Sequence, residues 1–180
     1  AIITERVDRR QNDIGALVRF DSNHLDVELY GGHRRYDILD NVLEEFDHKN
    51  LNLDMSYFKD RIPTSENLAR LLWTKLEVQK DIGALHTIRL YEDEDLYAEV
   101  TAAAGLDVAS VTRRYSFTAV QDGNQGRDWD CFVTVHGTIN PMTGMVIDIG
   151  ALNRLVQEKV VQALDRHDLR QALGTQAVTG

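Results

Sequence analysis

The spacing of hydrophobic residues predicts two amphipathic helices in the first half of the chain. In residues 36–46, apolar side chains recur at helical spacing with acidic residues between them. These apolar residues are Tyr36, Leu39, Leu43 and Phe46. A second helix is predicted over residues 66–78, where four leucines fall on one stripe, and the hydroxyls of Thr64 and Ser65 just before it can cap the free amides of its first turn.

Alternating apolar and polar residues predict strands on both sides of these helices. Residues 85–92 read as a strand in which Ile88 and Leu90 alternate with polar residues, and residues 94–100 form its hairpin partner across an acidic turn. Residues 16–21 and 25–30 are predicted as strands before the helices. The order strand, strand, helix, helix, strand, strand predicts an α+β fold.

The second half of the chain repeats the opening of the first. Strands are predicted at residues 113–120 and 131–137, followed by a helix at residues 150–164 whose apolar stripe is Leu152, Leu155, Val156, Val160 and Leu164. Residues 28–51 align without a gap over residues 146–169, which matches Asp47 with Asp165 and sets Arg166 over His48. The alternative is that any two amphipathic helices preceded by a glycine look alike.

The repeat predicts a domain organisation in three parts. Residues 1–100 form one complete unit, residues 101–111 a linker of small residues, and residues 112–180 a partial second unit. The second unit stops before its second helix, which would leave an apolar face and an open sheet edge exposed. We therefore expect either a C-terminal continuation or another subunit to cover that surface.

Composition and charge narrow the classes of partner. The formal net charge of −9 would repel nucleic-acid phosphates and anionic lipids, so neither a nucleic acid nor a membrane is a predicted partner. Two local arginine pairs, Arg34-Arg35 and Arg113-Arg114, could still hold an anionic small molecule, because guanidinium forks suit phosphate oxygens. A single cysteine, Cys131, and the absence of a long apolar run lead us to expect a cytoplasmic protein.

Several ordered motifs carry a resemblance to a known family. They are FDHKNLN at residues 46–52, PTSENLA at 63–69, LYE at 90–92, VTVHG at 133–137 and NPMTGMVID at 140–148. The first three resemble the C-terminal half of the 6-pyruvoyl- and 6-carboxytetrahydropterin synthases, and the last two are similar to the middle strand and turn of the same family. Ordered motifs at sensible spacing are much more specific than any one of them alone.

The resemblance implies a fold and a reaction that spacing alone does not. Such proteins have the tunnelling fold (T-fold), in which an antiparallel four-stranded sheet carries two helices on one face. They assemble into homo-oligomeric rings through their sheets, with active sites between subunits. Their usual substrate is dihydroneopterin triphosphate, from which these lyases eliminate triphosphate while rearranging or cleaving the side chain with the help of zinc. The expected partner is thus a small heterocycle, a pterin or a purine-like ring.

The resemblance also implies roles for five residues. His48 would transfer protons and Asp47 would orient its imidazole, since a carboxylate fixes the tautomer of a histidine. Glu92 would accept hydrogen bonds from the amino-pyrimidinone edge of a pterin, and Thr64 and Ser65 would line the same pocket. Each has a structural alternative: a helix-terminal turn for Asp47 and His48, a solvated hairpin carboxylate for Glu92, and helix capping for Thr64 and Ser65.

The chain departs from the family at the zinc site. The resemblance implies zinc bound by one histidine and a His-x-His pair, yet no His-x-His occurs in the sequence. The family's first histidine aligns near Gln121, and its Gly-His-Gly-His run aligns with residues 126–129, which contain no histidine. Residues 12–15, the equivalent region of the first copy, also lack histidine. Cys131 lies on the strand after the position of the family's cysteine base. We therefore predict no metal ligands and leave the cofactor unknown.

Three functions fit this departure. The chain could be a pterin-pathway synthase working through His48, Asp47 and Glu92. It could instead be a metal-free T-fold protein that binds a purine or pterin, or a degenerate structural subunit without catalysis.

Overall fold

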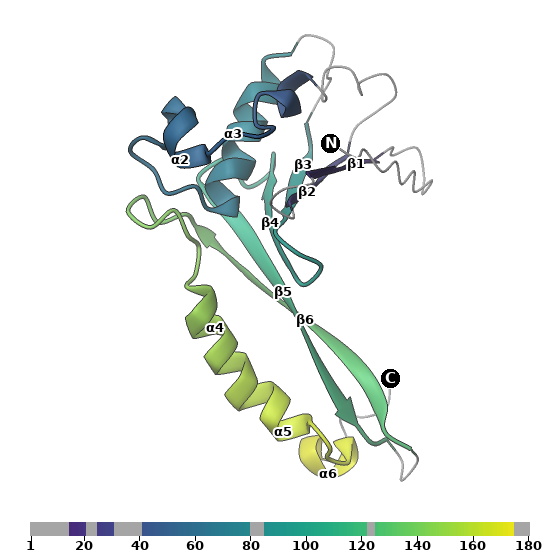
Figure 1. The fold of residues 1–180 in the computed structure, drawn as a ribbon. Coiled ribbons are helices and arrows are strands. Elements are labelled where there is room, and N and C mark those ends of the chain that lie inside the picture. The colour runs from purple at the N-terminus through teal and green to yellow at the C-terminus, as the bar shows by residue number, and fades with distance from the viewer. Residues whose placement is uncertain (1–14, 21–24, 31–40, 80–84, 122–124, 175–180) are drawn as a thin grey trace. The chain divides into compact units, whose positions relative to one another are not determined.

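The computed structural model describes the 180-residue chain apart from residues 1–14, 21–24, 31–40, 80–84, 122–124 and 175–180 (Figure 1). The described part is α+β, with six strands that neighbour one another in the order β1-β2-β3-β4-β5-β6. It divides into two compact units, residues 1–112 with 134–146 and residues 113–133 with 147–180. The long strands β5 (Val108–Ala119) and β6 (Arg127–Thr138) contribute to both units, so each unit is discontinuous in sequence.

The first unit is built on a four-stranded antiparallel sheet, as predicted. Its strands are β1 (Gly15–Phe20), β2 (Leu25–Tyr30), β3 (Thr87–Tyr91) and β4 (Leu96–Thr101). The register aligns Val27 with Leu90 and Leu90 with Ala98 across β2, β3 and β4. Residues 102–107 connect β4 to β5, which begins at Val108 within the region predicted as a linker.

One helix covers β3 and β4. This helix, α3 (Ser65–Glu77), packs against both strands and confirms the helix predicted at residues 66–78. Thr64 is its N-cap, with the side-chain oxygen accepting a hydrogen bond from the Asn67 amide at 3.2 Å. The helix predicted at residues 36–46 is described only at its end, where residues 41–44 are helical and Val42, Leu43 and Phe46 are buried; its beginning lies outside the described residues.

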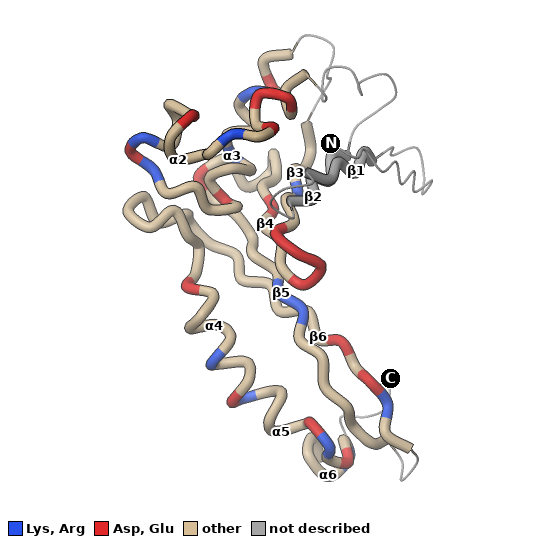
Figure 2. The backbone as a smooth tube through the Cα atoms, in the orientation of Figure 1, with Lys and Arg blue, Asp and Glu red and all other residues tan. Residues whose placement is uncertain are grey.

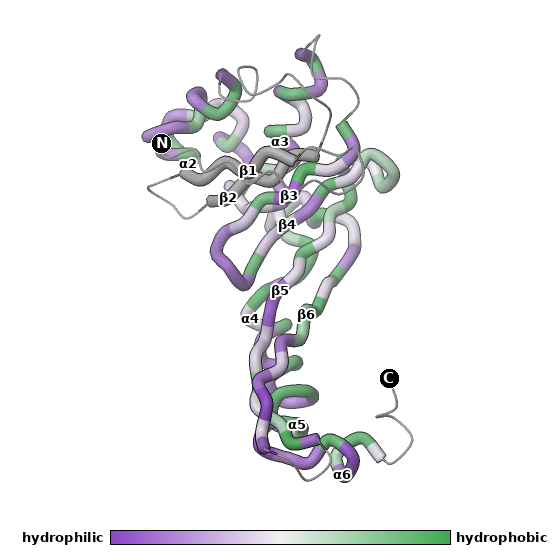
Figure 3. The backbone as a smooth tube through the Cα atoms, turned by 90° about the vertical axis from the view of Figure 1, so that its right-hand side faces the viewer, coloured by the Kyte–Doolittle hydropathy of each residue, from purple (hydrophilic) through white to green (hydrophobic). Residues whose placement is uncertain are grey.

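The core of the first unit follows the period-two pattern of the strands. The side chains facing α3 are fully buried and apolar, namely Ile88, Leu90, Ala98 and Val100. Burying one such aliphatic side chain stabilises a fold by roughly 1.5–3 kcal/mol. The other face carries polar and aromatic pairs, with Arg89 opposite Glu99 and Tyr91 opposite Tyr97. The acidic turn that joins these strands is hydrophilic throughout (Figure 3).

Two short helices follow the first helix in the same unit. They are α2 (Leu51–Asp54) and the 3-10 turn η1 (Ser56–Phe58). Phe58 is buried in the same cluster as Leu68 and Leu72 of α3.

The second unit contains the remaining parts of β5 and β6 and a helix with a π-helical turn. The helix consists of α4 (Ile149–Val156), the π-turn η2 (Gln157–Val161) and α5 (Gln162–Leu164). Its buried residues are Leu152, Val156 and Val161, a step of four and then of five, because a π-turn adds one residue to the repeat. Leu155 was predicted on the apolar stripe and is 55% exposed, because the buried stripe is narrower than the sequence pattern.

The ends of the two helices that the sequence aligns have the same local geometry. His48 and Arg166 both have a positive φ, 55° and 59°. Two residues later, Asn50 caps α2, and Asp168 caps the short helix α6 (Leu169–Leu173), each accepting from two backbone amides. The shared turn agrees with the alignment of residues 28–51 over 146–169, while the tandem repeat as a whole stays a prediction.

Candidate functional site

The Asp47-His48 pair lies where the first helix ends. The helix closes on Leu43, whose carbonyl accepts hydrogen bonds from the amides of Phe46 and Asp47. His48 then reverses the chain in the left-handed region, a conformation in which histidine is found more often than most residues. Its Nε2 lies 3.5 Å from Asp47 Oδ2, which is within the distance of an ion pair. The His48 side chain is 82% exposed, so a molecule approaching from solvent can reach its imidazole.

Glu92 lies on the acidic turn that follows β3, which is coloured red beside β4 in Figure 2. Its amide donates to the Leu96 carbonyl at 2.9 Å, which fixes the backbone, while its side chain is exposed. Within the described part of the chain, no hydrogen bond or ion pair engages its carboxylate. The turn itself is held by Asp93, whose Oδ1 accepts from the Asp95 amide at 2.7 Å.

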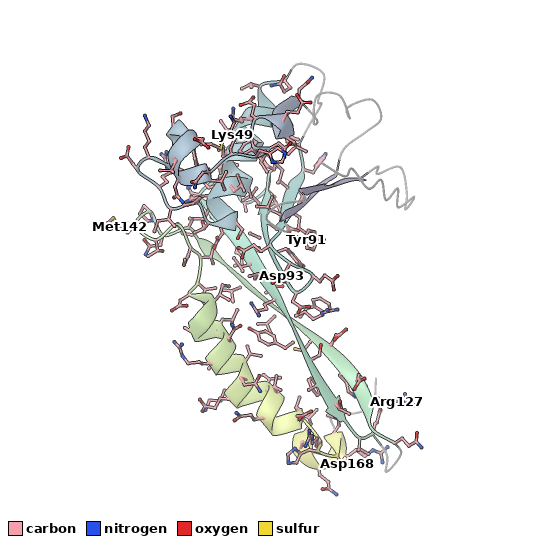
Figure 4. The ribbon with its side chains drawn as sticks, in the orientation of Figure 1. Lys49, Tyr91, Asp93, Arg127, Met142 and Asp168 are labelled. Atoms are coloured by element: carbon pink, nitrogen blue, oxygen red, sulfur yellow. The ribbon has the colours of Figure 1, made fainter. Side chains whose placement is uncertain are left out.

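The structure does not bring Glu92 and His48 together within one chain. Lys49 follows His48 and Asp93 follows Glu92, and these two labelled residues lie well apart in Figure 4. A site containing both groups would therefore need residues from two copies of the chain.

Thr64 and Ser65 take part in a contact with a distant turn. The Thr64 hydroxyl donates to the Gly144 carbonyl at 2.6 Å while it caps α3. The Ser65 hydroxyl donates to Glu66 Oε2 at 3.4 Å and is buried. Both hydroxyls are thus engaged inside the first unit, and a ligand would meet Thr64 mainly through its remaining lone pair and methyl group.

Three further residues, none of them predicted from the sequence, complete this contact. Glu66 is only 4% exposed, and its Oε1 accepts from the Val146 amide at 2.9 Å. Gly144 has a φ of +72° and lies so near Asn67 that a Cβ there would be 2.4 Å from Asn67 Nδ2. We call this contact the α3 clasp: Thr64, Glu66 and Asn67 against residues 140–146.

A sequence signal for the α3 clasp did exist. Asn140 and Gly144 are residues typical of tight turns, and Asn140 Oδ1 does accept from the amides of Met142 and Thr143. Their partner at the start of α3 was unpredictable, because the two segments are 80 residues apart.

The positions expected to carry zinc ligands do not form a zinc site. Arg127 is a cation, and Asp128 Oδ1 is occupied by the Thr118 hydroxyl at 2.6 Å. Cys131 is a free thiol on β6. Among the residues that the structure describes, no group of three or more His, Cys, Asp and Glu side chains could hold a metal ion. The donor set present there does not fit the zinc that the family resemblance implies.

The first unit is an α+β unit in which a sequential antiparallel sheet is covered by a helix. The sequence model described as 6-pyruvoyl tetrahydropterin synthase matches residues 33–103 and 124–178, more than half of the chain. The chain therefore belongs to the 6-pyruvoyl tetrahydropterin synthase family. No solved structure matches it.

Curated relatives are similar over a short segment. The 6-pyruvoyl tetrahydrobiopterin synthase of Pongo abelii is 37% identical over 54 residues, which are 30% of this chain and 37% of that protein. The Homo sapiens protein of the same name is 35% identical over 54 residues with the same shares. That of Poecilia reticulata is 34% identical over 53 residues, 29% of this chain and 36% of its own length. The chain thus spans little more than a third of these relatives.

None of the helices in the described residues is both long enough and apolar enough to cross a membrane.

Proposed function

We propose that this chain is a pterin-pathway synthase-like protein that binds, and as a lyase acts on, a substrate resembling dihydroneopterin triphosphate. The observation that carries the proposal is the Asp47-His48 pair, with an exposed imidazole beside a half-buried carboxylate, inside a segment matched by the family. An imidazole beside a carboxylate can accept and return a proton near neutral pH, as a side-chain elimination requires.

Glu92 is proposed to hold the flat ring. A carboxylate accepts two N–H bonds from an amino-pyrimidinone edge, and charge-assisted bonds of this kind are about twice as strong as neutral ones. The exposed carboxylate of Glu92, without a partner in the described residues, supports this role. Thr64 and Ser65 are proposed to line the pocket from the start of α3.

The site is proposed to lie between subunits of a homo-oligomer. The separation of Lys49 and Asp93 in one chain supports this arrangement, because His48 of one copy would then meet Glu92 of another. Assembly through sheet edges would bring such surfaces together, as the resemblance implies.

The misfit at the zinc positions favours a second candidate. A T-fold protein that binds a pterin or purine without metal would keep Glu92 and need no zinc ligands. Arg127 and the engaged Asp128 are the observations that favour it.

Calorimetric titration with dihydroneopterin tests the binding claim. Glu92→Gln should weaken binding by about two orders of magnitude, because the ring's N–H donors would lose a charged acceptor. Glu94→Gln is the matched control, since it removes the same charge from the same exposed turn. Equal affinity in both variants would remove Glu92 from the site.

Release of triphosphate from dihydroneopterin triphosphate separates the two candidates. A synthase should release it, and His48→Gly should abolish the release while leaving the fold intact, because glycine tolerates the positive φ at this position. A wild-type protein that binds the pterin but releases nothing, with or without added zinc, favours the metal-free binding protein. Loss of the oligomer in His48→Gly would instead assign the histidine a structural role.

A further inference from the structure

A groove of about 770 Å³ lies in the second unit, between β5 and the helix formed by α4 and η2. This volume is in the range of small-molecule sites. The strand contributes Arg113 and Tyr115, and the helix contributes Asn153, Arg154 and Gln157. None of the residues proposed above for the pterin site lines it.

The strand side chains that face the helix are identified by one hydrogen bond. The Tyr115 hydroxyl donates to Asn153 Oδ1 at 2.9 Å, so the side chain of Tyr115 points at α4. Arg113 is two residues away and shares that face of the strand. Burial raises the pKa of Tyr115, although the positive charge of Arg113 opposes this effect. The raised pKa keeps the hydroxyl protonated, so that it can donate. The amide Nδ2 of Asn153 then remains available to a ligand.

Two guanidinium groups in this groove lack an anionic partner. Neither Arg113 nor Arg154 forms an ion pair or side-chain hydrogen bond with any residue that the structure describes. Arg114 differs, because it lies 3.9 Å from Asp130. The groove's one carboxylate, Glu158, is paired with Lys159. Arg113 is half-buried and Arg154 is exposed. A half-buried cation without an acceptor is costly, and a second cation across the same groove adds to its positive charge, so this arrangement favours an anion.

The polar residues that line the groove argue against a further amphipathic helix as its ligand. In the first unit, the strand residues beneath α3 are Ile88, Leu90, Ala98 and Val100, all apolar and fully buried. The lining of this groove is mostly polar, with arginine, tyrosine, serine, glutamate and amide side chains and with Val161 as its apolar member. Amphipathic helices bury apolar stripes, and polar donors suit a small ligand with oxygen acceptors.

We propose that this groove binds a small molecule carrying a phosphate or diphosphate group, held by Arg113 and Arg154 with the Asn153 amide as a third donor. Arg113 and Arg154 line the same groove, and guanidinium forks match the bidentate geometry of phosphate oxygens. The local positive charge attracts such an anion to a chain whose formal net charge is −9. The inference is independent of the proposed pterin site, because the two share no residue.

Calorimetric titration of the full chain with inorganic pyrophosphate, in metal-free buffer of low ionic strength, tests the proposal. Wild-type protein should bind, and Arg154→Gln should weaken binding by about tenfold or more, as loss of a charge-assisted pair requires. Arg154 is exposed on the helix, so its replacement should leave the fold intact. Arg113→Gln should have a similar effect, and added salt should weaken all binding.

Arg127→Gln is the matched control, because it removes the same charge from an exposed position on β6 of the same unit, outside the groove. It should change the affinity by no more than about twofold, the size expected of a screened surface charge. The proposal is overturned if wild-type protein does not bind millimolar pyrophosphate. It is equally overturned if Arg127→Gln weakens binding as much as Arg154→Gln does.

Discussion

Gly144→Ala is expected to break the α3 clasp. Gly144 sits at φ +72° in the turn of residues 140–146, and its amide donates to the Asn140 carbonyl at 2.7 Å. An alanine there would carry a methyl group 2.4 Å from Asn67 Nδ2 and 3.1 Å from the Thr64 hydroxyl oxygen. Asn67 is buried and donates to the Ile62 carbonyl at 2.9 Å, so it cannot rotate away without losing that bond.

The expected loss has two parts. A non-glycine residue in the left-handed region costs roughly 1–2 kcal/mol. Inserting a methyl group into a packed site costs about 1–3 kcal/mol more, because neighbours must shift. We therefore expect Gly144→Ala to lower the free energy of unfolding of the first unit by about 2–5 kcal/mol.

Gly105→Ala is the matched control for this measurement. Gly105 has almost the same φ, +78°, but a Cβ there would meet no atom within 4 Å. It should show only the conformational cost of roughly 1–2 kcal/mol. Urea unfolding in a Trp129→Phe background, followed by fluorescence of the buried Trp73 in α3, would report on the first unit. Equal losses in the two variants would refute the steric argument, as would an unchanged unfolding midpoint in Gly144→Ala.

Two further predictions concern side-chain pairs. Glu99→Gln should lower the free energy of unfolding by about 1–3 kcal/mol, because the half-buried Arg89 guanidinium would lose the carboxylate that accepts from its Nε at 2.8 Å. An unfolding midpoint in urea equal to that of the wild type would contradict this prediction. Because burial raises the pKa of Tyr115, its contribution to stability is complete below about pH 10 and is lost as pH rises through the folded-state pKa. Between about pH 8 and 11, the free energy of unfolding should therefore fall less steeply with pH in Tyr115→Phe than in the wild type. Parallel curves of the free energy of unfolding against pH would argue against a raised pKa of Tyr115.

The local parts of the fold could be predicted from the sequence because they depend on near neighbours. The leucine stripe and the Thr64 cap define α3 to within a residue, and Ile88 and Leu90 alternate in β3 as expected. The helix after β6 was predicted as one regular element, and the π-turn at Gln157–Val161 was missed. No side chain in that stretch distinguishes a π-turn from an α-turn. The exposure of Leu155, which precedes the π-turn, was not foreseen because the apolar pattern does not show how wide the buried stripe is.

The candidate site was predictable only as a set of residue types. A family motif identified Asp47 and His48, and the structure adds that the turn depends on a positive φ at His48. The sequence could not indicate that the Thr64 hydroxyl donates to the Gly144 carbonyl, because that contact joins segments 80 residues apart. The sequence does single out Arg113 as part of an arginine pair, but it does not predict the groove, since Arg154 comes from a helix 41 positions later in the chain.

A crystal structure of the chain with dihydroneopterin bound would test the proposed pterin site most directly. We expect the amino-pyrimidinone edge within hydrogen-bonding distance of both Glu92 carboxylate oxygens, with His48 of a neighbouring copy facing the side chain of the ligand. A pterin bound elsewhere, with Glu92 and His48 both facing water, would contradict it.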